Sequence, residues 1–147
     1  MGVMSKKCWN EFPNFKPSEF KCSCGCEQEY IKMDCNLIRL LQRTRNHFKK
    51  SITITCGHRC KKYNNSLVAK GWAVSNSVHV DQSDGDVRAA DIVITGYTSL
   101  QKRLEVIKYL KEQPEYDFAY HYNPASSSAR ERTCKNMGNA IHIQVKK

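Results

Sequence analysis

The spacing of hydrophobic and polar residues predicts a chain of mixed helices and strands. Apolar residues at helical spacing indicate an amphipathic helix over residues 30–49 and another over roughly 100–112, where Ser99 is a suitable N-cap. A shorter helix is expected over residues 61–70, ended by Gly71. Alternating or β-branched apolar runs predict four strands, over residues 51–55, 89–94, 118–122 and 141–145.

These elements favour one α+β domain covering residues 1–147, with a small antiparallel sheet flanked by helices. No internal repeat and no linker divides the chain, and 147 residues are enough to bury a core. Residues 1–19 are expected to form an irregular N-terminal extension. Residues 123–138, rich in Ser and Arg, are expected to form a mobile loop.

The net charge of the chain limits the classes of binding partner to expect. The chain has 24 Lys and Arg against 14 Asp and Glu, a formal net charge of +10, which favours a polyanionic partner. No apolar run approaches the roughly 18 residues of a membrane span, and residues 1–10 lack the apolar stretch of a signal peptide. We therefore expect a monomer that is synthesised in the cytoplasm and has no membrane span.

The acidic residues are not spread evenly. Between Asp81 and Asp91 there are four acids and one base, and His79 lies just before them. Crowded carboxylates repel one another unless solvent or a cation relieves them. The stretch is therefore either a solvated acidic loop or part of a cation site.

Asp91 makes the cation site the sharper hypothesis. It lies in an otherwise apolar strand, where a buried carboxylate is costly without a partner or a metal. His79 and His142 could supply the partners, although a lone histidine in a strand is more often structural. Two imidazoles and one carboxylate are a usual ligand set of an open zinc site. The three residues are therefore candidate ligands of a single zinc ion.

Eight cysteines leave the bonding of the thiols open. The densest group is Cys22, Cys24 and Cys26, which we expect to be structural. Its spacing is not that of a common zinc finger, and without a signal peptide free thiols or a structural zinc are as plausible as disulfides. No thiol is marked by its neighbours as a catalytic nucleophile.

Six short motifs follow one another along the chain: Phe20–Cys26 (FKCSCGC), Ile52–Arg59 (ITITCGHR), Tyr63-Asn64, Ser77–His79 (SVH), Ala89–Ile92 (AADI) and Ile141–Ile143 (IHI). In this order they resemble the M15 family of zinc D-Ala-D-Ala carboxypeptidases and related L-Ala-D-Glu endopeptidases. That family shares its fold with the Hedgehog signalling domain. The resemblance covers roughly residues 12–145.

The resemblance implies a role for each matching residue. His79, Asp91 and His142 would bind one catalytic zinc ion. Arg59 would hold a carboxylate of the substrate, a group that suits a guanidinium fork, and Ser77 would contact the substrate or a zinc ligand. The implied reaction is attack of a zinc-activated water on a peptide bond beside a D-amino acid.

Three departures from the family pattern bear on the site. Eleven residues, 80–90, separate His79 from Asp91, more than is usual. The acidic stretch 81–86 therefore resembles an insertion that alters substrate access or binds a second cation. Cys56 stands where the family usually has a serine, and no carboxylate occupies the family's usual catalytic positions.

The general base must then come from elsewhere in the chain. The candidates are Asp117, Glu131, His121 or an acid of the stretch 81–86. His121 is the first choice because histidine is the commonest general acid or base. It lies in the strand that precedes the last one. The alternative is a surface histidine with no catalytic role.

The leading hypothesis is a zinc peptidase that cleaves peptidoglycan stem peptides at an anionic bacterial cell wall, which would attract a basic protein. The small size and the start without a signal peptide suggest a phage lysin released at lysis or a wall hydrolase carried in a virion. The alternative is a catalytically weak or inactive homologue that binds zinc and the wall. A nucleic-acid partner is not expected, because the bases are scattered and no nucleic-acid motif occurs.

Overall fold

Four strands form one antiparallel sheet. The computed structural model describes residues 6–22, 33–73, 77, 79–80 and 87–146. The strands are β1 (Ile52–Cys56), β2 (Ala89–Ile94), β3 (Tyr116–His121) and β4 (Ile141–Val145). Their order across the sheet is β1-β2-β4-β3, with every neighbouring pair antiparallel. The expected α+β class with a small antiparallel sheet is confirmed.

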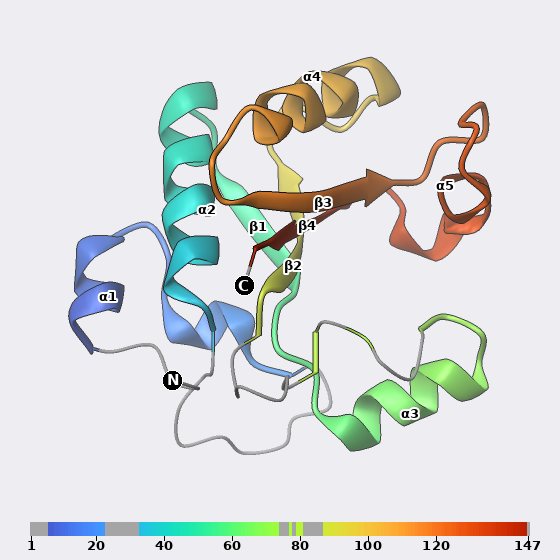
Figure 1. Ribbon diagram of the computed structural model, residues 1–147, viewed down its shortest axis with the longest axis horizontal. Helices are drawn as coiled ribbons and strands as arrows, with labels where there is room; N and C mark the ends of the chain where they lie inside the picture. Colours follow the sequence, from blue (N-terminus) through green and yellow to red (C-terminus); the bar gives the residue numbers. More distant parts are fainter. Residues whose placement is uncertain (1–5, 23–32, 74–76, 78, 81–86, 147) are drawn as a thin grey trace.

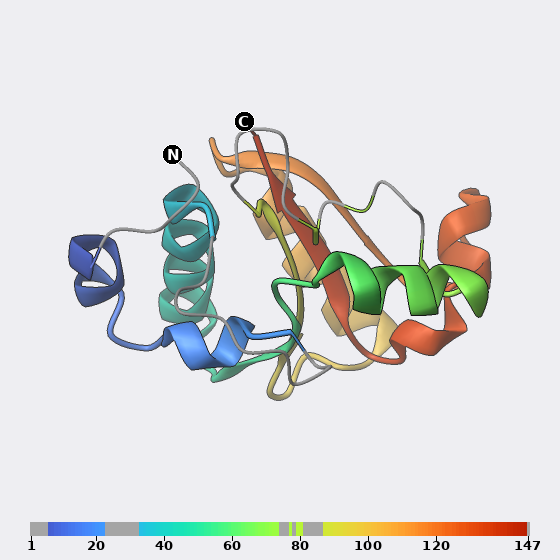
Figure 2. The same ribbon diagram turned by 90° about the horizontal axis from the view of Figure 1, so that it is seen from below.

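Helices surround this sheet, with α3 and α4 on opposite sides of it (Figure 1, Figure 2). The α-helices of the described residues are α1 (Lys6–Glu11), α2 (Cys35–Phe48), α3 (Lys61–Ala69), α4 (Leu100–Lys111) and α5 (Ala129–Thr133), and the 3₁₀ turns are η1 (Pro17–Phe20) and η2 (Lys135–Met137). Ser99 caps α4 as expected, since its side chain accepts a hydrogen bond from the Lys102 N–H at 3.2 Å. Gly71, with φ of 76°, follows the end of α3.

The core lies between the sheet and helices α2 and α4. In β4, alternation places Ile141, Ile143 and Val145 on this face, each at most 1 % exposed. The helices bury Leu37, Ile38, Leu40 and Leu41 from α2, and Val106, Ile107 and Leu110 from α4. The other face of the sheet is therefore left for polar side chains.

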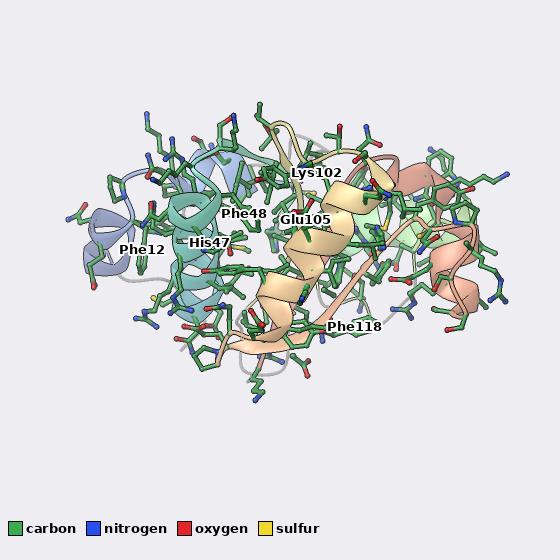
Figure 3. All side chains as sticks on the ribbon, turned by 90° about the horizontal axis from the view of Figure 1, so that it is seen from above. Phe12, His47, Phe48, Lys102, Glu105 and Phe118 are labelled. Atoms are coloured by element: carbon green, nitrogen blue, oxygen red, sulfur yellow. The ribbon has the colours of Figure 1, made fainter. Side chains whose placement is uncertain are left out.

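Aromatic rings join α2 to α4. Figure 3 looks onto α4 with α2 beside it, and labels His47 and Phe48 near the end of α2. His47 stacks on Tyr109 at 4.1 Å between ring centroids, and Phe48 contacts Tyr109 edge-on at 5.4 Å. These contacts fix the two helices on the core face of the sheet.

The N-terminal segment is more regular than the sequence suggested. Residues 1–19 were expected to form an irregular extension, but α1 and most of η1 lie within them. Phe12, Phe15 and Phe20 from this segment are buried in the core, at 7 %, 2 % and 0 % exposure. Their irregular spacing gives no helical or strand period, so burial of these rings could not be predicted from the pattern.

The expectation of a mobile loop over residues 123–138 is also wrong, because the segment contains α5 and η2. Ser128 caps α5, and Glu131 accepts hydrogen bonds from the Ser126 hydroxyl at 2.6 Å and, through its backbone carbonyl, from the Asn123 N–H at 2.8 Å. Local side-chain hydrogen bonds of this kind order a Ser-rich segment without an apolar period.

Candidate metal centre and cavity

A row of four residues, one from each strand, crosses the face of the sheet opposite the core. Cys56 pairs with Asp91, Asp91 with His142, and His142 with Tyr120. The register shifts between Ile54 and Cys56, which is a β-bulge. Because successive residues of a strand face opposite sides, the extra residue turns Cys56 onto the face of Asp91.

His79 joins this row from a connecting segment. Its carbonyl accepts a hydrogen bond from the Arg59 N–H at 2.7 Å, and its own N–H donates to the Ser77 hydroxyl at 3.2 Å. His79 is 3 % exposed and Ser77 7 % exposed. Two backbone bonds therefore hold the imidazole against the sheet.

The three residues predicted as zinc ligands converge on one point. Asp91 Oδ1 lies 2.9 Å from His142 Nδ1 and 3.3 Å from His79 Nε2, and the two nitrogens lie 3.3 Å apart. The side chains of His79, His142 and Asp91 are 4 %, 5 % and 16 % exposed. The arrangement is a compact, nearly dry set of two imidazoles and one carboxylate.

Hydrogen bonds on the far side of each ring set its tautomer. His79 Nδ1 lies 2.8 Å from the Gly57 carbonyl, which can only accept, so this nitrogen carries the proton. Gln144 donates through Nε2 to Asp117 at 2.9 Å, which directs its Oε1 to His142 Nε2 at 3.3 Å. His79 Nε2 and His142 Nδ1 both face the Asp91 carboxylate and would offer lone pairs to a metal once their protons leave. Carbonyl and amide partners of this kind orient metal-binding histidines.

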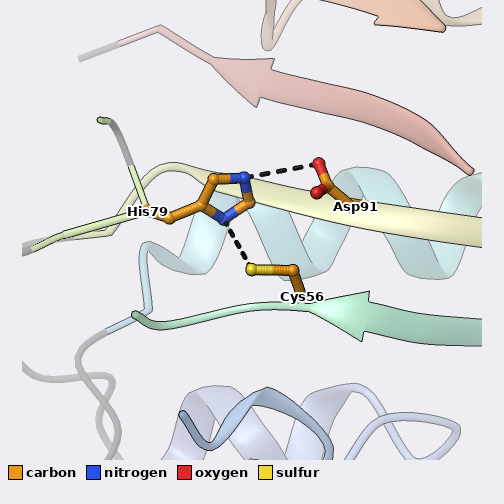
Figure 4. Close-up of side chains that lie close together, drawn as sticks. All are labelled: Cys56, His79 and Asp91. Atoms are coloured by element: carbon orange, nitrogen blue, oxygen red, sulfur yellow. Dashed lines mark hydrogen bonds and ion pairs between the residues drawn. The ribbon is translucent and has the colours of Figure 1, made fainter. Parts of the chain in front are cut away.

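Cys56 forms a second group of possible metal ligands with His79 and Asp91, whose donor atoms lie within 4.8 Å of one another (Figure 4). Cys56 Sγ, however, is 3.5 Å from His79 Nδ1, the nitrogen on the opposite side of the ring from Asp91. Cys56 was not among the ligands predicted for this site. Only the β-bulge brings it to this face, and no pattern in the sequence marks that bulge.

The carboxylate and the sulfur of the site stabilise positive charge on His79. Burial alone would lower the pKa of His79, but the Asp91 carboxylate and the Cys56 sulfur outweigh it and raise the pKa to about 10. Burial opposes ionisation of Asp91 too, yet the charge of His79 and a hydrogen bond from His142 hold its pKa below the usual range. The pKa of the Cys56 thiol is likewise lowered by His79 against the effect of burial.

Arg59 lies beside the cluster and is 8 % exposed. Its Nη1 donates to Asn64 Oδ1 at 2.8 Å and to the Ser77 hydroxyl at 3.4 Å, and its Nη2 donates to Cys56 Sγ at 3.3 Å. Its buried Nε–H has no hydrogen-bond partner among the described residues. The guanidinium is thus held at a fixed place next to the metal ligands.

A cavity of about 840 Å³ opens above the cluster, within the size range of ligand sites. His79, Asp91 and His142 line it together with Arg59 and Ser77. Its walls come from α3, from the chain that follows α3, and from the segment of α5 and η2, through Tyr63, Leu67, Trp72, Arg130, Thr133 and Met137. A peptide-sized ligand placed here would contact the cluster and Arg59 at once.

His121 does not belong to this site, so its assignment as general base was wrong. It pairs with Ile141, on the core face, and is 1 % exposed. Its Nδ1 lies 3.1 Å from Arg103 Nη1 of α4, and burial and the Arg103 charge lower its pKa. Tyr120, its neighbour in β3, faces the site instead and stacks on His142 at 4.7 Å.

The other candidates for the base also lie away from the cavity. Asp117 accepts the hydrogen bond from Gln144, and Glu131 is held by Ser126 and by the backbone of His121. Among the described residues that line the cavity, Asp91 is the only carboxylate. The predicted insertion at residues 81–86 lies outside the described residues.

The cysteine cluster is described only in part. Cys22 is buried, and its sulfur accepts a hydrogen bond from the Cys60 N–H at 3.3 Å. Cys24 and Cys26 lie outside the described residues. Cys35 is disulfide-bonded. At least two cysteines are therefore oxidised, Cys35 and its partner. Cys22 links the segment after η1 to the start of α3.

A small α+β fold with imidazole and carboxylate donors on the floor of a cavity is typical of a metal-dependent hydrolase. The family model described as Peptidase M15 matches residues 13–123, so the chain belongs to the M15 peptidase family, as the resemblance indicated. This family implies a peptide substrate. The matched residues include His79 and Asp91, while His142 lies beyond them. Comparisons with curated proteins and with solved structures give no match.

Within the described residues, no helix has the length and apolar character required to cross a membrane.

Proposed function

We propose that this chain is a zinc peptidase that cleaves peptide bonds in peptidoglycan stem peptides. The observation that carries the proposal is the convergence of His79 Nε2, His142 Nδ1 and Asp91 Oδ1, at 2.9–3.3 Å from one another, on the floor of the cavity. In a tetrahedral zinc site with bonds of about 2.0–2.2 Å, neighbouring ligand atoms lie about 3.3 Å apart. The three donors therefore fit zinc closely.

A zinc ion held by these ligands would supply a Lewis acid that activates water and polarises a carbonyl group. The chain's own residues prepare the site for that chemistry. The Gly57 carbonyl and Gln144 orient both histidines toward Asp91. Arg59 binds a carboxylate of the peptide, because a rigid guanidinium beside the ligands can form paired hydrogen bonds with that group. Ser77 supports both Arg59 and the His79 backbone.

The assay measures zinc content and the cleavage of synthetic stem peptides, with and without a chelator. His142→Ala is expected to lose stoichiometric zinc and cleavage, whereas Cys56→Ser, which removes the thiol of the competing ligand group, is expected to keep its zinc. Circular dichroism checks that both variants fold. If Cys56→Ser loses the metal and His142→Ala keeps it, the ligand set is the Cys56 group; cleavage that survives chelation would overturn the zinc mechanism.

A second candidate is a catalytically weak or inactive homologue that binds zinc and the wall. The observation in its favour is that, among the described residues lining the cavity, no carboxylate other than Asp91 is available as a general base. A protein that holds stoichiometric zinc and sediments with purified walls but releases no peptide fragment would support this candidate. Release of defined fragments would exclude it.

The net charge of the chain supports a proposal for its place of action. We propose that the protein acts at the bacterial cell wall as a lysin or a virion-associated wall hydrolase, since a net charge of +10 favours anionic wall polymers. Wall binding that weakens steeply as salt rises would support this location. Equal binding to walls stripped of anionic polymers would count against it.

A further inference from the structure

Arg130 is a second guanidinium on the cavity, and the peptidase reaction proposed above gives it no role. It lies in α5 and is exposed, with its Cζ 5.1 Å from the centroid of the Tyr120 ring and 5.9 Å from that of Phe118. Within the described part of the chain, the contacts of its guanidinium are with these two rings, and it forms no hydrogen bond or ion pair. An arginine stacked on aromatic rings keeps its in-plane N–H groups available for a ligand.

The stacking places Arg130 close to the metal centre. Tyr120 contacts Arg130 and also stacks on His142, with 4.7 Å between the ring centroids. Arg130 is therefore at most about 10 Å from the His142 ring, which corresponds to roughly three residues of extended peptide. Charges on Arg130 and on Arg59 both act on the Tyr120 phenol, so both guanidinium groups lie within electrostatic range of it.

Arg59 and Arg130 differ in burial and in their partners, so each could contact a different carboxylate of one substrate. Arg59 is buried and held by Asn64 and Ser77, whereas Arg130 stands exposed on the wall formed by α5. A peptide with one carboxylate near the scissile bond and another a few residues away could bind to both. A peptide with a single carboxylate could use only one.

We propose that Arg130 binds a second carboxylate of the peptide substrate, within about three residues of the scissile bond, and so determines a preference for diacidic over monoacidic stem peptides. The proposal rests on the proposed peptidase function for its substrate class. It requires no further ligand, because an arginine–carboxylate contact at the cavity wall is enough to discriminate the two peptides.

The experiment compares two synthetic stem peptides that differ only in whether the glutamate carboxylate is free or amidated. Binding is measured by calorimetry and cleavage by kcat/KM, for the wild type, Arg130→Gln and Arg132→Gln. Arg132 is the matched control, since it lies in the same helix, donates to the Ser126 carbonyl at 2.9 Å and does not line the cavity. Circular dichroism and the zinc content establish that each variant is folded and loaded.

The wild type is expected to prefer the free carboxylate by about three- to tenfold, the range of a partly exposed charge-assisted contact. Arg130→Gln should remove that preference by weakening binding of the acidic peptide alone, and Arg132→Gln should retain it. A wild type without preference, or an Arg130→Gln protein that keeps it, would overturn the inference. A preference seen in binding without any cleavage would uphold Arg130 while the peptidase function fails.

Discussion

Gly57 supports the proposed metal centre from behind, and replacing it with alanine is the most direct test of this architecture. An added Cβ would lie 2.7 Å from the Cα, 2.8 Å from the Cβ and 2.9 Å from the carbonyl oxygen of Phe20. Phe20 is fully buried, so these atoms cannot rotate away. Gly57 must shift instead, and overpacking of this kind costs about 1–3 kcal/mol.

The same shift would reach the proposed zinc ligands. The Gly57 carbonyl accepts the hydrogen bond from His79 Nδ1 at 2.8 Å, and moving it by a few tenths of an ångström weakens the bond that orients the ring. Loss of such a partner usually lowers metal affinity by about 10- to 100-fold. Gly57→Ala should therefore lose both stability and zinc affinity.

Two assays separate the effects. Thermal unfolding of the chelated protein should show a melting temperature lower by roughly 3–10 °C for a chain of this length. Zinc competition against a chromophoric chelator measures the affinity. Thr53→Ala is the control, because Thr53 lies on β1 and is exposed.

The outcome has two independent parts. A Gly57→Ala protein with the same melting temperature as the Thr53→Ala control would show that Phe20 does not approach Gly57 as closely as described. A protein that melts early but binds zinc with unchanged affinity would show that the Gly57 carbonyl does not orient His79. Either result would refute the corresponding step of the reasoning.

Further predictions concern the same centre. Gln144→Ala should weaken zinc binding by about tenfold, the lower end of the usual range, because water can replace a half-buried amide near His142; unchanged affinity in the competition assay would contradict this. In chelator, the raised pKa of His79 adds stability that is complete below its ordinary value of 6.5 and is lost as pH rises toward about 10. The lowered pKa of Asp91 adds stability that is present above its ordinary value of 3.8 and is lost in stronger acid. The metal-free protein should therefore have its highest melting temperature between the two ordinary values, 3.8 and 6.5. A melting temperature that rises from pH 7 to 9 would contradict the assignment, and Asp91→Asn should flatten the profile.

Much of the fold could be predicted from periodicity. The strands over residues 89–94 and 141–145 and the Ser99 cap follow from patterns that span only a few neighbouring residues. Part of the site could also be predicted from the sequence. Asp91 is a lone carboxylate in an apolar strand, and such a residue needs a partner, which pointed to His79 and His142.

The features that could not be predicted depend on the pairing register of the strands. Whether Tyr120 or His121 faces the cavity is decided by how β3 pairs with β4, including a register shift between Tyr116 and Phe118. A shift of one residue reverses every side chain of a strand, and nothing in the local sequence shows it. The bulge that turns Cys56 toward Asp91 escaped for the same reason.

The position of His142 is stabilised by the core on the other side of its strand. Ile141, Ile143 and Val145 are buried against α2 and α4, and alternation then leaves His142 no place but the cavity face. A slip of β4 by one residue would expose these three side chains, at roughly 1.5–3 kcal/mol each, and would bury an imidazole without its partners. The hydrophobic core therefore fixes the position of the third proposed ligand, which explains how a histidine beyond the matched residues 13–123 can still lie beside Asp91.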